Sequence, residues 1–375
     1  MSVRTALFAL LLLLTNACSA QTAAPRFEGD VSDFQTKVPG TVSNTVYRAT
    51  TELGTFNHHP QIAYHDGLFV VAWSNGAFDE DAPGQRVLGA TSKDGVTWST
   101  PFEMFARRSP VAPWGAEADV LFATGFAKVD GRLFALAEIV RRRVVGEKYS
   151  REGQRLIARS VSASGRLGDL FELSPSTPGD ARLPSQYGRD RQAILRYIRD
   201  PQRMPYFSGM EISAKDGHTT IQPTYAYRVD GGHLRFLRDL DYSMKMYWQK
   251  TSDGREWSVP EPTNLPDSGA KSSILKLTDG RVVLFGAQIP VKWQRDPLTV
   301  ATSADGWVFR PVGAVRKGDG RPVTFSGKYH NPTDRPGFSY PSSIQVGDAI
   351  FVVYSVGAEH IDISRLPVSS LAVRD

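Results

Sequence analysis

Two adjacent histidines, His58 and His59, are of a type and in a setting that suit acid–base chemistry. They stand between Asn57 and Pro60, at the start of a segment that we interpret as a β-strand. An imidazole titrates near neutral pH, so it can act as a general acid or base, or donate a hydrogen bond to a ligand. Because side chains alternate along a strand, we expect only one imidazole to face the centre of the fold. His65 is the only other histidine nearby and the spacing matches no metal-ligand set, so we expect no metal and no other cofactor.

Carboxylates gather shortly afterwards, in the loop 78–84. The loop contains Asp79, Glu80 and Asp81, and Arg86 follows it. An acidic run in a loop is usually just solvated, but one of its carboxylates could also serve in catalysis or bind a substrate. The run becomes a candidate site if the fold brings it to the histidines.

A short motif, Ser/Thr-x-Asp-Gly-x-x-aromatic, occurs three times and indicates how the chain is organised. The copies begin at Ser92, Thr251 and Ser303, so the first interval (251 − 92 = 159 residues) is about three times the second (303 − 251 = 52). Asp-Gly forms a tight turn in which glycine takes a positive φ and the aspartate accepts hydrogen bonds from nearby amides. We expect each copy to stabilise a hairpin rather than contact a substrate. A spacing near 50 residues is typical of repeat architectures.

Short apolar strands that follow turn residues recur along the same chain. They are rich in β-branched and aromatic residues and lie at 68–74, 133–138, 282–286 and 349–355, with a weaker one at 234–236. Helical periodicity is confined to residues 190–197, before Pro201. We therefore predict an all-β fold, a β-propeller of four-stranded blades. Six blades fit best and seven are the alternative, because residues 140–245 carry no clean motif; the period argues against a two-sheet sandwich.

The N-terminus and the overall charge indicate where the protein works. Residues 1–20 have the pattern of a signal peptide, too short to span a bilayer: Arg4, an apolar run at 6–14 and small residues at 17–20. Cys18 is the only cysteine; it is either a lipid acceptor or, as we prefer, removed by cleavage after Ala20. We expect a monomer exported to the periplasm or the exterior, with an N-terminal extension at 21–50 and a single propeller domain at 51–375.

The formal net charge is +5, but basic and acidic residues are interleaved, which argues against a nucleic-acid partner.

The turn motif is a slightly shortened Asp-box of the bacterial neuraminidase repeat, and the chain resembles the sialidase superfamily over most of residues 55–365. Residues 67–86 resemble the first sialidase blade, whose loop bears the acid/base aspartate; this implies that role for Asp81, or for Asp79. Residues 338–344 resemble the segment that carries the nucleophilic tyrosine, which implies that role for Tyr340. The expected fold is accordingly a propeller of sialidase type.

The resemblance also implies partners for these residues. In sialidases a mid-chain glutamate activates the tyrosine, a role implied here for Glu211, while Arg203 and Lys271 could pair with an anionic sugar. Sialidases begin the first blade with Arg-Ile-Pro, and that arginine clamps the substrate carboxylate. Here histidine replaces the arginine, and an imidazole cannot reproduce bidentate pairing with a carboxylate.

Three functions stay open at this point. The first is a glycoside hydrolase acting on an acidic sugar, with Asp81 as acid/base, Tyr340 as nucleophile and a histidine replacing part of the arginine clamp. The candidate substrate ligands are Asn57, Glu80, Arg86, Arg203 and Lys271. The second is a propeller polysaccharide lyase, in which histidine and tyrosine act on a uronate while a cation neutralises its carboxylate. The third is a propeller that binds a glycan without cleaving it.

Overall fold

The computed structural model describes residues 23–113, 116–145, 148–173, 185–203, 211–318, 324–325 and 337–372. The predicted signal peptide, with Cys18, lies outside these residues. Among the described residues, no helix combines the length and the apolar character needed to cross a membrane.

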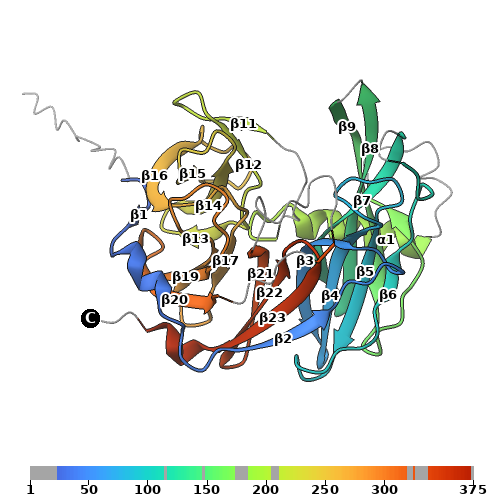
Figure 1. Ribbon diagram of the computed structural model, residues 1–375, viewed down its shortest axis with the longest axis horizontal. Helices are drawn as coiled ribbons and strands as arrows, with labels where there is room; N and C mark the ends of the chain where they lie inside the picture. The colour runs from blue at the N-terminus through green and yellow to red at the C-terminus, as the bar shows by residue number, and fades with distance from the viewer. Residues whose placement is uncertain are drawn as a thin grey trace, which may run out of the picture.

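Five β-sheets make up the described part of the chain, and they form the blades of a propeller (Figure 1). The first blade contains β3 (Phe56–His65), β4 (Leu68–Gly76), β5 (Arg86–Ser92) and β6 (Phe102–Phe105). The second contains β7 (Ala118–Val129), β8 (Arg132–Val145), β9 (Lys148–Val161) and β10 (Phe171–Glu172). The third contains β11 (Ile212–Ser213), β12 (Thr219–Ile221), β13 (Tyr227–Val229), β14 (Gly232–Asp239), β15 (Lys245–Thr251) and β16 (Glu261–Pro266).

The last two blades take strands from both ends of the chain. The fourth contains β17 (Ser273–Lys276), β18 (Val282–Gly286), β19 (Leu298–Ser303) and β20 (Val308–Arg316), and β1 (Arg26–Phe27) adds to β20 in parallel. The fifth contains β21 (Phe338–Val346), β22 (Ala349–Val356) and β23 (His360–Pro367), and it is completed by β2 (Val42–Tyr47). Figure 1 shows β2 running beside β23, so the N-terminal segment ties the last blade into the fold.

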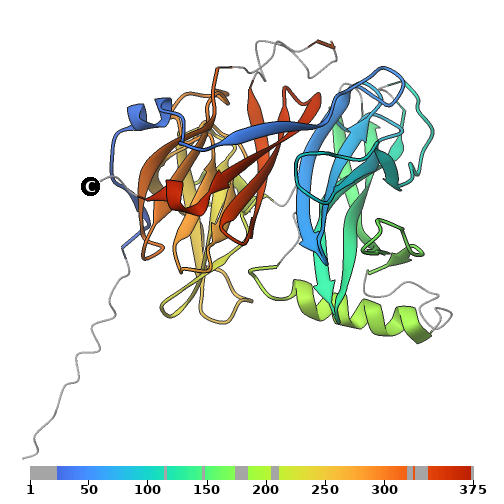
Figure 2. The same cartoon turned by 90° about the horizontal axis from the view of Figure 1, so that it is seen from below.

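The helices lie outside the sheets. The α-helix α1 (Ser185–Ile198) covers the predicted helical segment, and its buried Ile194 packs against Phe134 and Phe171 of the second blade. Figure 2 shows α1 crossing the ends of the neighbouring strands. Two short 3₁₀ helices, η1 (Val31–Gln35) and η3 (Val368–Leu371), lie near the chain ends.

The prediction of an all-β propeller is confirmed, but the predicted count of six or seven blades is wrong. The structure has five blades within the described residues. The error arose within residues 140–245, where the sequence carries no clean motif. Part of that interval belongs to the hairpin of β8 and β9, each of 14 residues, and part to α1. Strand length and a helix therefore account for residues that the spacing had assigned to another blade.

The three Asp-box turns join the outer strands of three blades, as predicted. In the first, the Ser92 hydroxyl donates to Asp94 Oδ1 at 2.9 Å, and the same oxygen accepts from the amides of Val96 and Thr97 at 2.8 Å. Gly95 has φ 72° and donates its amide to Ser92 Oγ. The other two copies repeat these hydrogen bonds. Their role is structural.

Candidate functional site

Irregularities in the first strands of the blades position the candidate site. The pairing of β3 with β4 shifts register between His58 and Gln61, and that of β21 with β22 shifts between Ser339 and Ser342. His59 (φ 55°) and Tyr340 (φ 56°), the residues inside these shifts, adopt the left-handed region, which is uncommon for non-glycine residues. Bulges of this kind re-aim side chains and are frequent beside active sites.

Both histidines pack against Tyr340, which corrects the expectation that only one would face the centre. The Tyr340 ring centroid lies 4.1 Å from that of His58 and 4.8 Å from that of His59. The bulge interrupts the alternation of the strand, so the two imidazoles also pack on each other, at 4.7 Å. All three side chains are at most 5% exposed. The first and last blades thus meet in one buried aromatic cluster.

His59 connects this cluster to the acidic loop. Its Nε2 lies 3.3 Å from Glu80 Oε1, and its Nδ1 lies 3.2 Å from Ser74 Oγ, which also accepts the amide of Ala123. Burial lowers the pKa of the His59 imidazole, although Glu80 opposes the shift. A neutral ring with its proton on Nε2 donates to Glu80 and accepts the Ser74 hydroxyl at Nδ1. The loop and the first strand are therefore held together, which makes the acidic run part of the candidate site.

Tyr340 is fixed on its other side by Gln222, a residue that the sequence analysis did not identify. Gln222 Nε2 donates to the Tyr340 hydroxyl at 3.0 Å, and Gln222 Oε1 accepts from Arg238 at 3.4 Å. Since a guanidinium can only donate, this contact orients the amide with its N–H toward the phenol. Arg238 is 8% exposed and its charge interacts with Tyr340. A donor and a cation therefore face the phenol oxygen.

A buried acid lies between Arg238 and a second arginine. Asp267, just after β16, is 1% exposed, and burial raises the pKa of its carboxyl to about 7, although Arg238 and Arg295 oppose the shift. Arg295 is 3% exposed, and both guanidiniums lie over the ring of Trp293, at 5.9 Å for Arg238 and 5.5 Å for Arg295. This side of the site carries two cations and one carboxyl that titrates near neutral pH.

Asp81 is fully buried behind the histidines. Its Oδ2 accepts from Arg151 Nη2 at 2.7 Å and Nε at 3.2 Å, whereas its Oδ1 has no hydrogen-bond partner among the described residues. The Arg151 guanidinium lies 5.1 Å from the ring centroid of Phe122, and that ring is 5.4 Å from His59. Asp81 thus belongs to the same neighbourhood as His59, through Arg151 and Phe122.

Asn57 has a scaffold role instead of the expected contact with substrate. Its side-chain amide donates to the carbonyls of Gly54 and Glu359 and accepts from Trp73 Nε1 and Asn75 Nδ2. These four bonds use its full capacity and leave none for a ligand. The guanidinium of Arg86 is likewise engaged, by Asn75, Glu103 and the Leu53 carbonyl.

Of the remaining predicted site residues, one lies beside Tyr340 and two lie elsewhere. Lys271 is 7% exposed and shares a small cavity with Pro341, beside Tyr340; burial lowers the pKa of its amine to about 8. Arg203 lies elsewhere, exposed after α1, where it pairs with Asp200 at 3.3 Å. Glu211 is exposed at the start of β11, and the described contacts of Tyr340 include Gln222 rather than Glu211.

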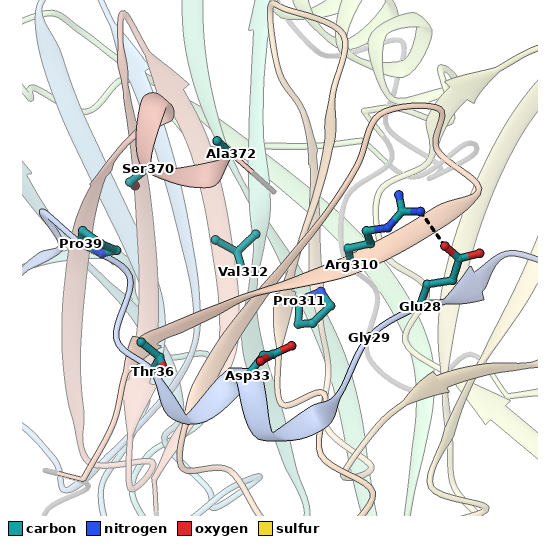
Figure 3. Close-up of a pocket in the computed structure, with 10 residues that line it drawn as sticks. All are labelled: Glu28, Gly29, Asp33, Thr36, Pro39, Arg310, Pro311, Val312, Ser370 and Ala372. Atoms are coloured by element: carbon teal, nitrogen blue, oxygen red, sulfur yellow. Dashed lines mark hydrogen bonds and ion pairs between the residues drawn. The ribbon is translucent and has the colours of Figure 1, made fainter. Parts of the chain in front are cut away.

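Two other features are distinct from this site. A hollow of about 340 Å³ lies between the N-terminal segment and β20, where Arg310 pairs with Glu28 at 2.6 Å (Figure 3). The ligand atoms of His218, Asp239 and Asp241 lie within 4.8 Å of one another, a spacing that could hold a metal ion. The carboxylates of this group already accept backbone amides, including that of Ser243, so we assign it to turn formation.

The protein is a β-propeller. A tyrosine and two histidines lie near the starts of the first strands of its last and first blades, and buried arginines lie close to the tyrosine. Residues 177–353 match a family model described as a BNR repeat-like domain. Residues 41–124 match a model described as a BT_1020-like N-terminal β-propeller. No curated protein matches the chain.

Solved structures similar to this chain include sialidases. One sialidase superposes with a TM-score of 0.66 at 19% identity, over 92% of this chain and 35% of its own length. The Trypanosoma rangeli sialidase in complex with sialic acid gives 0.55 at 13%, over 90% of this chain and 60% of its own. A protein of unknown function from Dyadobacter fermentans gives 0.53 at 14%, over 88% of this chain and all of its own. This chain spans about a third of the first sialidase. The resemblance to the sialidase superfamily is confirmed: residues 177–353 match a BNR repeat-like domain, and the propeller is similar in fold to those of sialidases.

Proposed function

We propose that the protein is an exported glycoside hydrolase that cleaves a glycan carrying a carboxylate, with Tyr340 as its nucleophile. The observation that carries this proposal is the hydrogen bond from Gln222 Nε2 to the Tyr340 hydroxyl, backed by Arg238. Donors aimed at an oxygen on which charge develops stabilise a transition state most when they are preorganised and buried. Gln222 and Arg238 meet both conditions.

A phenol suits a substrate that has its own carboxylate. An anionic nucleophile such as aspartate would be repelled by that group, which is why tyrosine can replace the usual carboxylate. Arg238, whose charge interacts with Tyr340, and Arg295, which like Arg238 interacts with Asp267, supply buried positive charge. The sialic acid bound by the T. rangeli sialidase is an acidic sugar, which supports the same substrate class.

Asp81 is proposed as the acid/base. In the first step one of the two imidazoles packed against Tyr340 takes the phenolic proton, Tyr340 Oη bonds to the anomeric carbon, the glycosidic C–O bond breaks, and Asp81 gives its proton to the leaving oxygen. In the second step water attacks the anomeric carbon, Asp81 takes a proton from the water, the bond to Tyr340 breaks, and the imidazolium returns its proton to the phenolate. Arg151 fixes Oδ2 of Asp81, so the unpartnered Oδ1 is the oxygen assigned to proton transfer.

The test is turnover of a panel of sialylated and uronic-acid glycans, with analysis of the product. A new saturated reducing end, absent when Tyr340 is replaced by phenylalanine, is the expected result. If wild-type protein binds an acidic glycan but leaves it intact after long incubation, the hydrolase proposal is wrong and the site is a binding site.

A polysaccharide lyase is the second candidate, and the identity of Gln222 favours it. An amide cannot accept a proton from Tyr340, whereas two imidazoles pack against that residue. In a lyase an imidazole removes the proton α to the uronate carboxylate, Tyr340 protonates the leaving oxygen, and the C–O bond breaks with formation of a double bond. The product then absorbs in the ultraviolet, which a hydrolase product does not.

A further inference from the structure

A second hollow lies farther along β3 and β21, the strands that carry His58, His59 and Tyr340. Its volume is about 470 Å³, within the range of roughly 300–1,000 Å³ that is usual for small-molecule sites. In β3 the candidate site uses His58 and His59, and the hollow uses residues 61–64; in β21 the site uses Tyr340, and the hollow uses residues 342–345. At about 3.3 Å per strand residue, the midpoints of these segments lie roughly 12–13 Å apart along the strands.

The lining of this hollow combines aromatic rings with cations. The rings are those of Tyr64, Phe126, Tyr197, Tyr225 and Tyr227. The cations are Lys128, Arg203 and Lys276, and the lining residues that the structure describes include no aspartate or glutamate. Aromatic faces offer apolar area to one side of a sugar ring, and cations favour anionic groups on it.

The charges of these cations are compensated to different degrees. Arg203 pairs with Asp200 at 3.3 Å and lies over the Tyr197 ring at 4.8 Å. The ammonium of Lys276 donates to the carbonyl of Arg228, a neutral acceptor. Lys128 interacts with Asp66, and burial lowers the pKa of its amine. Lys276, whose acceptor is neutral, therefore contributes most of the net positive charge.

A buried polar group on the wall points to a ligand as well. Gln61 is only 2% exposed and lines the hollow, and its Nε2 has no hydrogen-bond partner among the described residues. A buried amide donor left without a partner costs about 1–3 kcal/mol. A ligand hydroxyl or carboxylate at the base of the hollow would satisfy it.

We propose that this hollow is a second, non-catalytic binding site for an acidic oligosaccharide. One sugar ring packs on the aromatic wall, its anionic group faces Lys128 and Lys276, and a polar substituent accepts from Gln61. The proposal goes beyond the glycan-cleaving function, because it requires no reaction and none of the groups around Tyr340.

The test measures reaction of individual lysines with an amine-acetylating reagent, read by mass spectrometry, with and without a galacturonic acid trisaccharide. The Tyr340→Phe variant is used so that the probe is not consumed. Acetylation of Lys128 and Lys276 should fall several-fold when the probe is added, and acetylation of the exposed Lys93 in the first Asp-box turn should not change. The protection of the lysines does not depend on whether the Tyr340 site is catalytic. A negative result here would therefore contradict the second binding site without contradicting the proposed hydrolase activity.

Calorimetry with matched variants completes the test. Replacing Lys128 and Lys276 by glutamine should weaken trisaccharide binding in this hollow roughly tenfold, whereas Lys93→Gln should have no effect. A neutral galactose trisaccharide should bind more weakly than the acidic one. Equal protection of the lysines by inorganic sulfate alone, or unchanged trisaccharide affinity in the double variant, would overturn the proposal.

Discussion

The ring of Tyr340, from the first strand of the last blade, lies 4.1 Å from the ring of His58, from the first strand of the first blade. These residues are 282 positions apart in sequence (340 − 58), and they meet because the first and last blades are neighbours around the centre. The N-terminal β2 secures that arrangement by pairing with β23. The packing of the last blade against the first therefore closes the propeller and also assembles the candidate site.

Removal of the Tyr340 hydroxyl should abolish catalysis without unfolding the protein. Tyr340→Phe keeps the ring packed on both histidines and loses only the oxygen that Gln222 contacts, so we expect kcat to fall by about 1,000-fold or more. Asp81→Asn should also abolish turnover. Steady-state assays on an acidic glycan, together with unfolding temperatures, check both variants. Full activity in both would show that the site is assigned wrongly.

Gln222→Met should lower kcat more than it changes KM. The replacement has a similar volume but no N–H for the phenol, and it removes the acceptor for Arg238. An interaction that strengthens in the transition state is lost, and we expect a decrease of about 10- to 100-fold in kcat. Gln249→Met, at a buried glutamine that bonds Arg235 and lines neither site, is the matched control. An equal effect of the two variants would point to a general loss of stability.

Some of the residues that the structure brings together could be predicted from their residue type and their position relative to a strand. His58, His59 and Tyr340 stand at the start of recognisable strands, and Glu80 follows the first hairpin, so these residues could be grouped from the sequence. Gln222 could not, because it is 118 residues from Tyr340 and belongs to no motif. Its backbone, like those of His59 and Tyr340, has a positive φ that nothing in the residue type indicates.

The blade count failed for a related reason. The turn motifs and the second strands of the blades were predicted correctly, because Asp-Gly turns and short apolar runs are local signals. The 14-residue strands β8 and β9 continue outward with polar residues, including Arg141 and Arg143, which local patterns do not distinguish from a loop. Tertiary pairing along that hairpin, and not propensity, defines these strands.

Asn57 should prove to be a residue of stability and not of substrate binding. Asn57→Ala leaves Trp73 Nε1, Asn75 Nδ2 and two carbonyls without their buried partner. We expect the free energy of unfolding to fall by at least about 3 kcal/mol. Urea titration followed by tryptophan fluorescence measures it. If stability is unchanged and only KM rises, the scaffold role is refuted.

The first Asp-box turn should make a contribution to stability that disappears in acid. Hydrogen bonds from the amides of Thr97 and Val96 lower the pKa of Asp94 below its usual value. A lowered folded-state pKa means that the contribution is present above the unfolded pKa, near 4, and is lost as the pH falls toward the folded value. Asp94→Ala should therefore lower the unfolding temperature at pH 7 and differ less from wild type near pH 3. Glu52→Ala, at an exposed position, is the control; a difference that does not depend on pH would exclude this explanation.

The affinity for an acidic glycan should weaken as Asp267 ionises. Burial raises the pKa of this carboxyl to about 7, so at pH 6 it is mostly neutral and Arg238 and Arg295 keep their full net charge. At pH 8 the carboxylate offsets part of that charge, and we expect KM for an anionic substrate to rise roughly three- to tenfold between the two.

Asp267→Asn replaces the carboxyl by an amide that does not ionise. The variant therefore separates the effect of Asp267 from that of any other group that ionises near neutral pH. The variant should keep at pH 8 the low KM that wild type has at pH 6. Its stability should respond in the matching direction. A raised folded-state pKa contributes stability that is lost as the pH rises from about 4 through 7, so the variant should be more stable than wild type at pH 8. Measuring KM and the unfolding temperature of wild type and Asp267→Asn between pH 5.5 and 8.5 tests both the affinity prediction and the stability prediction. A KM profile that keeps its slope in Asp267→Asn would assign the pH dependence to another residue.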